Sequence, residues 1–344
     1  MKKILLTGST GFIGKNIKEL LPDKYELFCP THSELDLMDG NAVRRFIEDK
    51  EIGIVIHAAT LNTTKQQVSP ADVLKHNLTM FYNLERCHDL YEKMLYFGSG
   101  AEYDRTMGGT CSITEEDFDR SIPQDSYSLS KYVMAKHAEA SENIYDLCLF
   151  GTYGKYEEKE RRFISNMIFQ AKSSINLKSE LQAGEIKCGN AQTQSSAKMI
   201  MYQNAVYDYL WVEDLIPILE WFIENKPKYH RYNVCSGRRE ELINIAKLVK
   251  QVVICGVKKV ANQKAEQIIA QNASQCDCKS DNRIEEKDSA LNLEINPDIE
   301  IIVEKDGMNS EYTASNERLK KEMQSISFTS VECGVENLYN FLTK

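Results

Sequence analysis

Three glycines near the start of the chain constrain its fold more than any other feature. Residues 3–14 read KILLTGSTGFIG, in which a short apolar run ends at Thr7 and is followed by Gly8, Gly11 and Gly14. The pattern predicts a buried strand, a tight turn and a helix whose N-terminus offers N–H groups and a positive dipole end to an anion. A purely structural corner is the alternative. The position directly after a strand favours pyrophosphate binding.

Apolar runs and helical patterns alternate over the first 150 residues. Strands are expected at 25–29, 52–58, 94–97 and 146–150, and helices at 41–50, 70–92 and 126–141. Strands and helices that alternate at this spacing form parallel sheets with helices on both faces. The fold class predicted is therefore α/β, a Rossmann-type doubly wound parallel sheet.

The alternation becomes looser from residue 151. The patterns predict helices at 163–171, 213–224, 240–253 and 335–342, and strands at 207–212, 233–236 and 299–303. Residues 178–200 are expected to form a loop, and the polar stretch 258–294 to be partly helical. We expect residues 1–160 to form the nucleotide-binding domain and 161–344 mainly a smaller C-terminal substrate lobe, with 207–225 returning to the Rossmann sheet.

Composition excludes several classes of function. The net charge of −9 argues against a nucleic-acid surface, and no apolar run approaches the length of about 20 residues that a membrane span needs. The ten cysteines are scattered without zinc-knuckle spacing, which indicates reduced thiols in a cytoplasmic protein. Cys276 and Cys278 form the one close pair, and metal binding there is a minor alternative to the expectation of no metal site.

Three polar residues in successive βα units form a candidate catalytic set. Ser99 follows the strand at 94–97, and Tyr127 and Lys131 lie four residues apart on the next helix, within about 6 Å of each other. A tyrosine has a pKa near 10, so a phenolate at neutral pH needs a shift of roughly three units, or about 4 kcal/mol. A nearby ammonium can supply it. A plain helix-surface pair is the alternative, and the combination with Ser99 and the glycine turn argues against it.

These motifs together resemble those of extended short-chain dehydrogenases/reductases of the nucleotide-sugar epimerase/dehydratase/reductase branch. The matching segments are TGSTGFIG (7–14), VIHAAT (55–60), FGSGAEYD (97–104), YSLSK (127–131), LFGTYGKYE (149–157) and YDYLWVEDL (207–215). Residues 178–200 and 255–300 lie outside the resemblance. It implies an enzyme that transfers hydride to or from a nucleotide sugar, with Ser99, Tyr127 and Lys131 as its catalytic residues.

The resemblance also implies the binding residues. Those expected to bind the cofactor are Gly8, Thr10, Gly11, Phe12, Ile13, Gly14, His32, Asp36, Leu37, Ala58, Ala59, Thr60, Asn77, Tyr127, Lys131 and Phe150. Those expected to bind the substrate are Ser99, Gly100, Ala101, Arg162 and Asn166. The second strand ends in Cys-Pro-Thr-His without the acid that usually accepts the ribose diol of NAD, so we favour NADP(H) over NAD(H).

Side chains that related enzymes use for catalysis and that this sequence lacks limit the reactions to be expected. Within the family the layout is closest to GDP-fucose synthases, but Ala101 and about Asn166 stand in place of their epimerisation Cys and His. Gly100 and Ala101 replace the Asp-Glu pair of 4,6-dehydratases. Reduction of a 4-keto sugar nucleotide with Tyr127 as general acid/base is therefore favoured. The alternatives are a 4-epimerase, a C4 dehydrogenase, a reductase of a non-nucleotide carbonyl, and a non-catalytic NAD(P)-binding regulatory protein.

The resemblance also implies an oligomeric state and a biological role. Helices near 72–92 and 126–141 resemble those that pair as a four-helix bundle in family dimers, so a homodimer is expected. A role in the synthesis of surface-polysaccharide precursors is what the family resemblance suggests.

Overall fold

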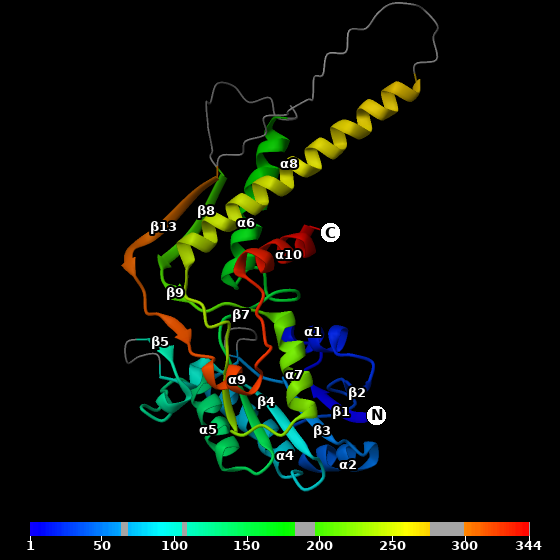
Figure 1. The fold of residues 1–344 in the computed structure, drawn as a ribbon, viewed down its shortest axis with the longest axis vertical. Helices are drawn as coiled ribbons and strands as arrows, with labels where there is room; N and C mark the ends of the chain where they lie inside the picture. Colours follow the sequence, from blue (N-terminus) through cyan, green and yellow to red (C-terminus); the bar gives the residue numbers. More distant parts are fainter. Residues whose placement is uncertain (63–67, 105–108, 183–196, 276–298, 344) are drawn as a thin grey trace, which may run out of the picture. The chain divides into compact units, whose positions relative to one another are not determined.

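A six-stranded parallel sheet is the main element of the computed structural model, which describes residues 1–62, 68–104, 109–182, 197–275 and 299–343 (Figure 1). Its order is β11-β6-β4-β3-β1-β2, and every neighbouring pair is parallel. The strands are β1 (Lys2–Thr7), β2 (Tyr25–Phe28), β3 (Ile54–His57), β4 (Lys93–Ser99), β6 (Ile144–Leu149) and β11 (Arg231–Val234). The order reverses at β1, the point where a Rossmann sheet binds its ligand. The predicted fold class is confirmed.

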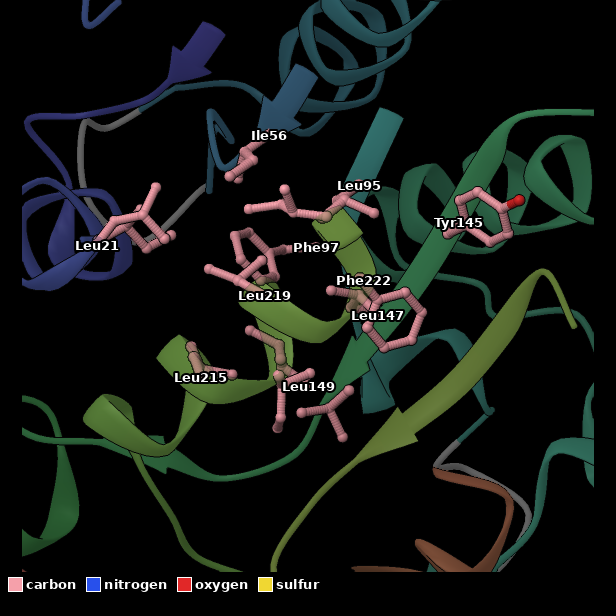
Figure 2. Close-up of a cluster of buried hydrophobic side chains, with 14 of the residues drawn as sticks. Leu21, Ile56, Leu95, Phe97, Tyr145, Leu147, Leu149, Leu215, Leu219 and Phe222 are labelled. Atoms are coloured by element: carbon pink, nitrogen blue, oxygen red, sulfur yellow. The ribbon is translucent and has the colours of Figure 1, made fainter. Parts of the chain in front are cut away.

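Alternating side chains of the strands divide between two helical layers. Those that include Leu6, Ile56 and Phe97 pack with α1 (Phe12–Leu20) and α7 (Leu215–Glu224). Figure 2 shows this cluster, in which leucines and a phenylalanine of α7 lie against the strands. Those that include Leu5 and Tyr96 pack with α2 (Gly40–Lys50), α4 (Pro70–Glu85) and α5 (Ser126–Ala140). Both faces of the sheet are therefore covered, which explains why its strands read as continuous apolar runs.

Smaller elements follow the ends of the main strands. A four-stranded sheet has the order β12-β9-β14-β5, and β7 pairs with β10. Their bounds are β5 (Thr110–Ile113), β7 (Thr152–Tyr153), β9 (Val206–Tyr207), β10 (Leu210–Trp211), β12 (Glu240–Glu241) and β14 (Tyr312–Ala314). Short helices are η1 (Gly100–Glu102), η3 (Glu115–Asp117), η4 (Val212–Asp214) and α9 (Glu317–Glu322).

The chain divides into two compact units, each built from three segments. The first unit contains residues 1–158, 203–243 and 306–334, and the second contains 159–202, 244–305 and 335–344. The elements that fall wholly or partly in the second unit are α6 (Phe163–Gln182), β8 (Ala197–Asn204), α8 (Leu242–Gln275), β13 (Ile299–Met308) and α10 (Val331–Thr343). The first segment ends close to the boundary predicted at residue 160, and two later segments return to the unit that holds the sheet.

Two parts of the second half differ from the sequence prediction. The strand expected at 207–212 is split into β9 and β10, neither of which joins the main sheet; β11 occupies its edge instead. This edge strand corresponds to the one predicted at 233–236 but begins two residues earlier. The polar Arg231 and Asn233 obscured its start, yet both are fully buried and paired. The loop expected at 178–200 is helical up to Gln182 and a strand from Ala197, and the residues between lie outside the described part.

Two features are not found in the described part of the chain. No helix in this part is both long and apolar enough to cross a membrane. No group of three or more His, Cys, Asp or Glu side chains within it is arranged to hold a metal. Cys276 and Cys278 lie outside the described residues.

Candidate functional site

The glycine turn after β1 is shaped by the backbone of two neighbouring segments. Gly8 has a φ of +69°, and a Cβ there would lie 2.5 Å from the Ala59 nitrogen. A Cβ on Gly14 would collide with the Gly8 carbonyl oxygen. At Gly11 a Cβ would meet only that same oxygen, at 3.3 Å, among the described residues. Gly8 and Gly14 are therefore required by the fold itself, whereas the space in front of Gly11 is open to a ligand.

The N-terminus of α1 faces this turn without a competing anion. Gly11 is its N-cap, no described side chain caps the helix, and no acidic residue lies in its first turn. Thr10 is exposed, and Phe12 and Ile13 are half-buried with their side chains against the core. A helix N-terminus with these properties attracts negative charge. The turn and helix fit the pyrophosphate of a dinucleotide.

Thr7 fastens the end of β3 to the glycine turn. Its carbonyl oxygen accepts from the Ala58 amide and its hydroxyl from the Ala59 amide, both at 3.3 Å. The same hydroxyl lies 2.8 Å from Nδ1 of His57. Burial lowers the pKa of His57 to about 3, so its imidazole is neutral. The predicted pair Ala58 and Ala59 is thus brought to Gly8, by two residues that the sequence analysis did not single out.

Asn77 of α4 fixes the loop that follows β3. Its side chain exchanges two hydrogen bonds with the Leu61 backbone, at 2.8 and 3.0 Å, and donates to the Ser130 hydroxyl at 3.2 Å. Thr60, directly before Leu61, is exposed. Asn77 therefore connects the predicted cofactor loop to the helix that carries Tyr127.

The residues predicted to bind the adenosine end lie on the loop after β2. His32 is exposed, and its Nε2 lies 3.9 Å from Oδ1 of Asp36. That oxygen also accepts from the Met38 amide at 2.9 Å, which gives Asp36 a local structural role beside its predicted one. Leu37 packs on the α2–α4 side of the core. The contacts of His32, Asp36 and Leu37 with adenosine remain predictions.

Lys131 brings the candidate catalytic residues together. Its side chain is buried, and Nζ donates to the Phe97 carbonyl at 2.8 Å, two residues before Ser99 at the end of β4. The same Nζ lies 4.7 Å from the ring centre of Tyr96 and 5.9 Å from that of Tyr127. Burial lowers the pKa of Lys131 to about 8. Lys131 and Tyr127 thus lie near each other and beside β4, the strand that ends at Ser99.

Ser99 is held by the short helix that follows it. Its hydroxyl oxygen accepts from the Ala101 amide at 3.2 Å, and its own amide donates to Oε1 of Glu102 at 2.8 Å. The amide occupies only a lone pair of the hydroxyl oxygen. The O–H itself can therefore still donate to a substrate oxygen. This arrangement fixes the direction of the hydroxyl at the edge of the sheet.

Gly100 is closely packed from two sides. A Cβ there would collide with the ring of Phe150 and the hydroxyl of Tyr312. Phe150, predicted to contact the cofactor, is fully buried in this packing. Ala101, the next residue, is half-buried. Position 100 therefore requires glycine and has no room for a carboxylate side chain.

A buried charged cluster lies behind these residues. Oδ2 of Asp146 accepts from Nε of Arg231 at 3.0 Å, and Nη2 of Arg231 lies 3.5 Å from Oε2 of Glu102. Burial raises the pKa of both carboxyls, that of Glu102 well above its usual range. None of these three residues was predicted from the sequence to belong to the site. The signal that could have found Asp146 is a lone acid within an apolar strand.

Two predicted substrate residues lie in the second unit. The Asn166 amide donates to the Arg162 carbonyl at 2.8 Å within the first turn of α6, and its side chain donates to the Glu160 carbonyl at 2.9 Å. Their roles toward a substrate stay predictions.

Known proteins with similar sequences and folds carry related names. The chain is 25% identical over 270 residues to GDP-L-colitose synthase of Yersinia pseudotuberculosis, covering 73% of this chain and 82% of that one. A GDP-L-fucose synthetase from Naegleria fowleri bound to NADP superposes with a TM-score of 0.72 at 13% identity, over 99% of this chain and 94% of the other. A GDP-mannoheptose C4 reductase from Campylobacter jejuni, also with NADP, gives 0.71 at 17% identity, over 100% and 98%.

A family model decides the assignment. The model described as "NAD dependent epimerase/dehydratase family" matches residues 4–235, which include the glycine turn, Ser99, Tyr127 and Lys131. The resemblance seen in the motifs is thereby confirmed. The chain belongs to the NAD-dependent epimerase/dehydratase family.

Proposed function

We propose that this protein is an NAD(P)-dependent oxidoreductase that reduces the 4-keto group of a nucleotide sugar. The observation that carries the proposal is the position of Lys131, whose Nζ donates to the Phe97 carbonyl at 2.8 Å, two residues before Ser99, and lies 5.9 Å from the ring centre of Tyr127. A structural helix has no need of a buried lysine in this place, because its desolvation costs free energy.

The side chains have distinct tasks in such a reduction. When bound along the glycine turn, the nicotinamide cofactor supplies the hydride. Ser99 donates a hydrogen bond to the C4 oxygen and holds it in place. Tyr127 gives its proton to that oxygen, and the ammonium of Lys131 stabilises the phenolate that remains. Reversal of the same proton transfer would serve oxidation of a C4 hydroxyl.

The packing around Gly100 supports reduction over elimination or carbon-acid epimerisation. Those reactions need a base at the position of Gly100 or Ala101, and Phe150 and Tyr312 fill the space that a side chain on Gly100 would need. Asn166 has no basic nitrogen to replace an imidazole. Removal and return of hydride at C4, as in a 4-epimerase, uses the same residues and is the second candidate, together with a C4 dehydrogenase.

The similar proteins suggest which nucleotide and which cofactor this enzyme uses. The names of the similar proteins point to GDP as the nucleotide, and the two similar structures hold NADP. The exposed His32 and the absence of an acid at the end of β2 also favour NADP(H). We further infer a cytoplasmic homodimer that pairs through α4 and α5 and makes precursors of surface polysaccharides.

A two-stage experiment tests the proposal. Thermal-shift measurements with NADP⁺, NAD⁺, GDP, UDP, CDP and dTDP should show stabilisation by a cofactor and by one nucleoside diphosphate. NADPH oxidation by the matching 4-keto sugar nucleotides should then disappear in Tyr127→Phe. Tyr132→Phe is the matched control, since this tyrosine lies on the same helix and its hydroxyl binds Asp119.

The alternatives give different results. A non-catalytic regulatory protein would bind cofactor without turnover, and a reductase of non-nucleotide carbonyls would gain no protection from any of the four nucleotides. Either result would exclude the proposed reaction.

A further inference from the structure

Four charged side chains meet within the core behind the proposed site. Lys131 is 4% exposed, Arg231 1%, and Glu102 and Asp146 are both 0% exposed. They come from α5, β11, η1 and β6, and the strand register places Arg231 directly opposite Asp146. Burying a charge costs free energy unless an opposite charge or hydrogen bonds compensate it. The net charge of this cluster therefore affects how readily a neighbouring group such as Tyr127 can ionise.

The two carboxyls face each other over Gly98. A Cβ on Gly98 would collide with both Oδ1 of Asp146 and Oε1 of Glu102, so both oxygens reach the same point above β4. Oδ1 of Asp146 is fully buried and receives no hydrogen bond from a described N–H or hydroxyl group. Two ionised oxygens in this position would repel each other strongly, whereas one proton between them supplies the missing donor.

Three ionisable side chains around Lys131 are neutral. Burial lowers the pKa of His57 to about 3 and raises the pKa of Tyr96 and Cys148 well above their usual ranges. The titratable or charged groups that face the cluster are His57 on β3, Tyr96 on β4, Glu102 on η1, Tyr103 directly after it, Asp119 after η3, Asp146 and Cys148 on β6, Arg231 on β11, and Tyr127, Tyr132 and Glu139 on α5. Glu139 lies 3.6 Å from Nη1 of Arg231, but it is 37% exposed and screened by water.

We propose that Glu102 and Asp146 share a single proton, which makes the buried cluster neutral when Tyr127 is ionised. Two cations, Lys131 and Arg231, then face two anions, the shared carboxylate and the phenolate. If both carboxyls were ionised, the phenolate would be a third buried anion and would be disfavoured. This inference rests on the proposed role of Tyr127 as acid/base.

Glu102 is thereby a positioning residue with two effects. Its carboxyl holds the Ser99 amide, and its proton removes one negative charge from beside Lys131. Neither effect requires contact with substrate.

The test compares carboxyl and amide at both positions. Glu102→Gln imitates a protonated carboxyl, so the pH profile of kcat/KM should stay in place and the maximum should fall less than about threefold. The double variant Glu102→Gln/Asp146→Asn removes the remaining negative charge, so the alkaline limb, where activity falls as pH rises, should move to lower pH by about one unit. If Glu102→Gln alone moves this limb that far, both carboxyls are ionised and the proposal is wrong.

Glu115→Gln is the matched control. Glu115 is also buried, accepts a backbone hydrogen bond from Asn233 at 2.8 Å, and has a pKa raised by burial, but it does not contact Ser99. It should leave the profile unchanged. Thermal unfolding with NADP⁺ verifies that each variant is folded.

An optical measurement separates this inference from the proposed function. Infrared spectra of the wild type at pH 8 should contain the carbonyl stretch of a protonated carboxylic acid, and Glu102→Gln should lack it. No substrate is needed. Absence of the band overturns the shared proton, whereas its presence without turnover of any nucleotide sugar overturns only the proposed reaction.

Discussion

Removal of the Lys131 ammonium should reduce activity by about two orders of magnitude. Nζ lies 5.9 Å from the ring centre of Tyr127. At this separation and an effective dielectric constant of about 20, a positive charge stabilises the phenolate by about 3 kcal/mol. That energy corresponds to roughly two pKa units, or about 100-fold in the acid strength with which Tyr127 gives its proton to the C4 oxygen. Lys131→Met keeps a long apolar stem without the charge.

The assay is hydride transfer measured as kcat/KM from pH 6 to pH 10. The wild type should lose activity above about pH 8, where Lys131 releases its proton, because burial lowers its pKa to about 8. Lys131→Met should lack this limb and remain low throughout.

Lys136→Met is the control for this prediction. Lys136 lies on the same helix and pairs with Asp119 at the surface, so the variant should keep full activity. The reasoning is refuted if Lys131→Met loses less than threefold, or if Lys136→Met loses as much.

Four further variants test the surroundings of the site. Gly14→Ala should unfold the protein or strongly lower its melting temperature, because its Cβ would collide with the Gly8 carbonyl, whereas Gly11→Ala should fold normally and weaken NADP⁺ binding at least about tenfold in a fluorescence titration. His57 should make the wild type less stable at acid pH: it is neutral when folded, with a pKa of about 3, and binds a proton when unfolded below about pH 6.5. Relative to His57→Gln, the wild type should lose about 2 kcal/mol between pH 6.5 and pH 5 in urea unfolding, and parallel curves would contradict this. Arg231→Met should cost about 3–5 kcal/mol because it leaves the buried negative charge of the Glu102–Asp146 pair without its cation, and a loss below about 1 kcal/mol in the same assay would show that the pair is uncharged.

Local patterns were sufficient to predict the central strands of the sheet and the closeness of Tyr127 to Lys131. The strands around Leu6, Ile56 and Phe97 are buried on both faces, so their apolar runs are unbroken in the sequence. Tyr127 and Lys131 are one helical turn apart, a spacing that any helix brings together. The glycine turn follows from the steric needs of Gly8 and Gly14 alone.

Long-range pairing limited the prediction elsewhere. Arg231 and Asp146 are separated by 85 residues and meet only because β11 lies beside β6. Glu102 lies two residues after Gly100, where the sequence suggests a solvated turn, but in the fold it ends η1 and pairs with Arg231. Such a network leaves no periodic signal, because each member looks like a surface charge until its partner is known.

The second unit was predicted least well for a related reason. Its elements α6 and α8 extend well beyond the apolar patterns at 163–171 and 240–253, into stretches rich in Gln, Asn, Lys and Ser. Polar helices of this kind carry little hydrophobic periodicity. Their existence could be expected from the sequence, but their ends could not.

The most direct test of the central claim follows the hydride itself. NADPH carrying deuterium at the nicotinamide C4 is incubated with GDP-, UDP-, CDP- and dTDP-linked 4-keto-6-deoxyhexoses, and the sugar products are analysed by mass spectrometry. The account predicts one deuterium at C4 of one product, formed by the wild type and lost with Tyr127→Phe. Deuterium at another carbon, or an undiminished rate in Tyr127→Phe, would contradict it.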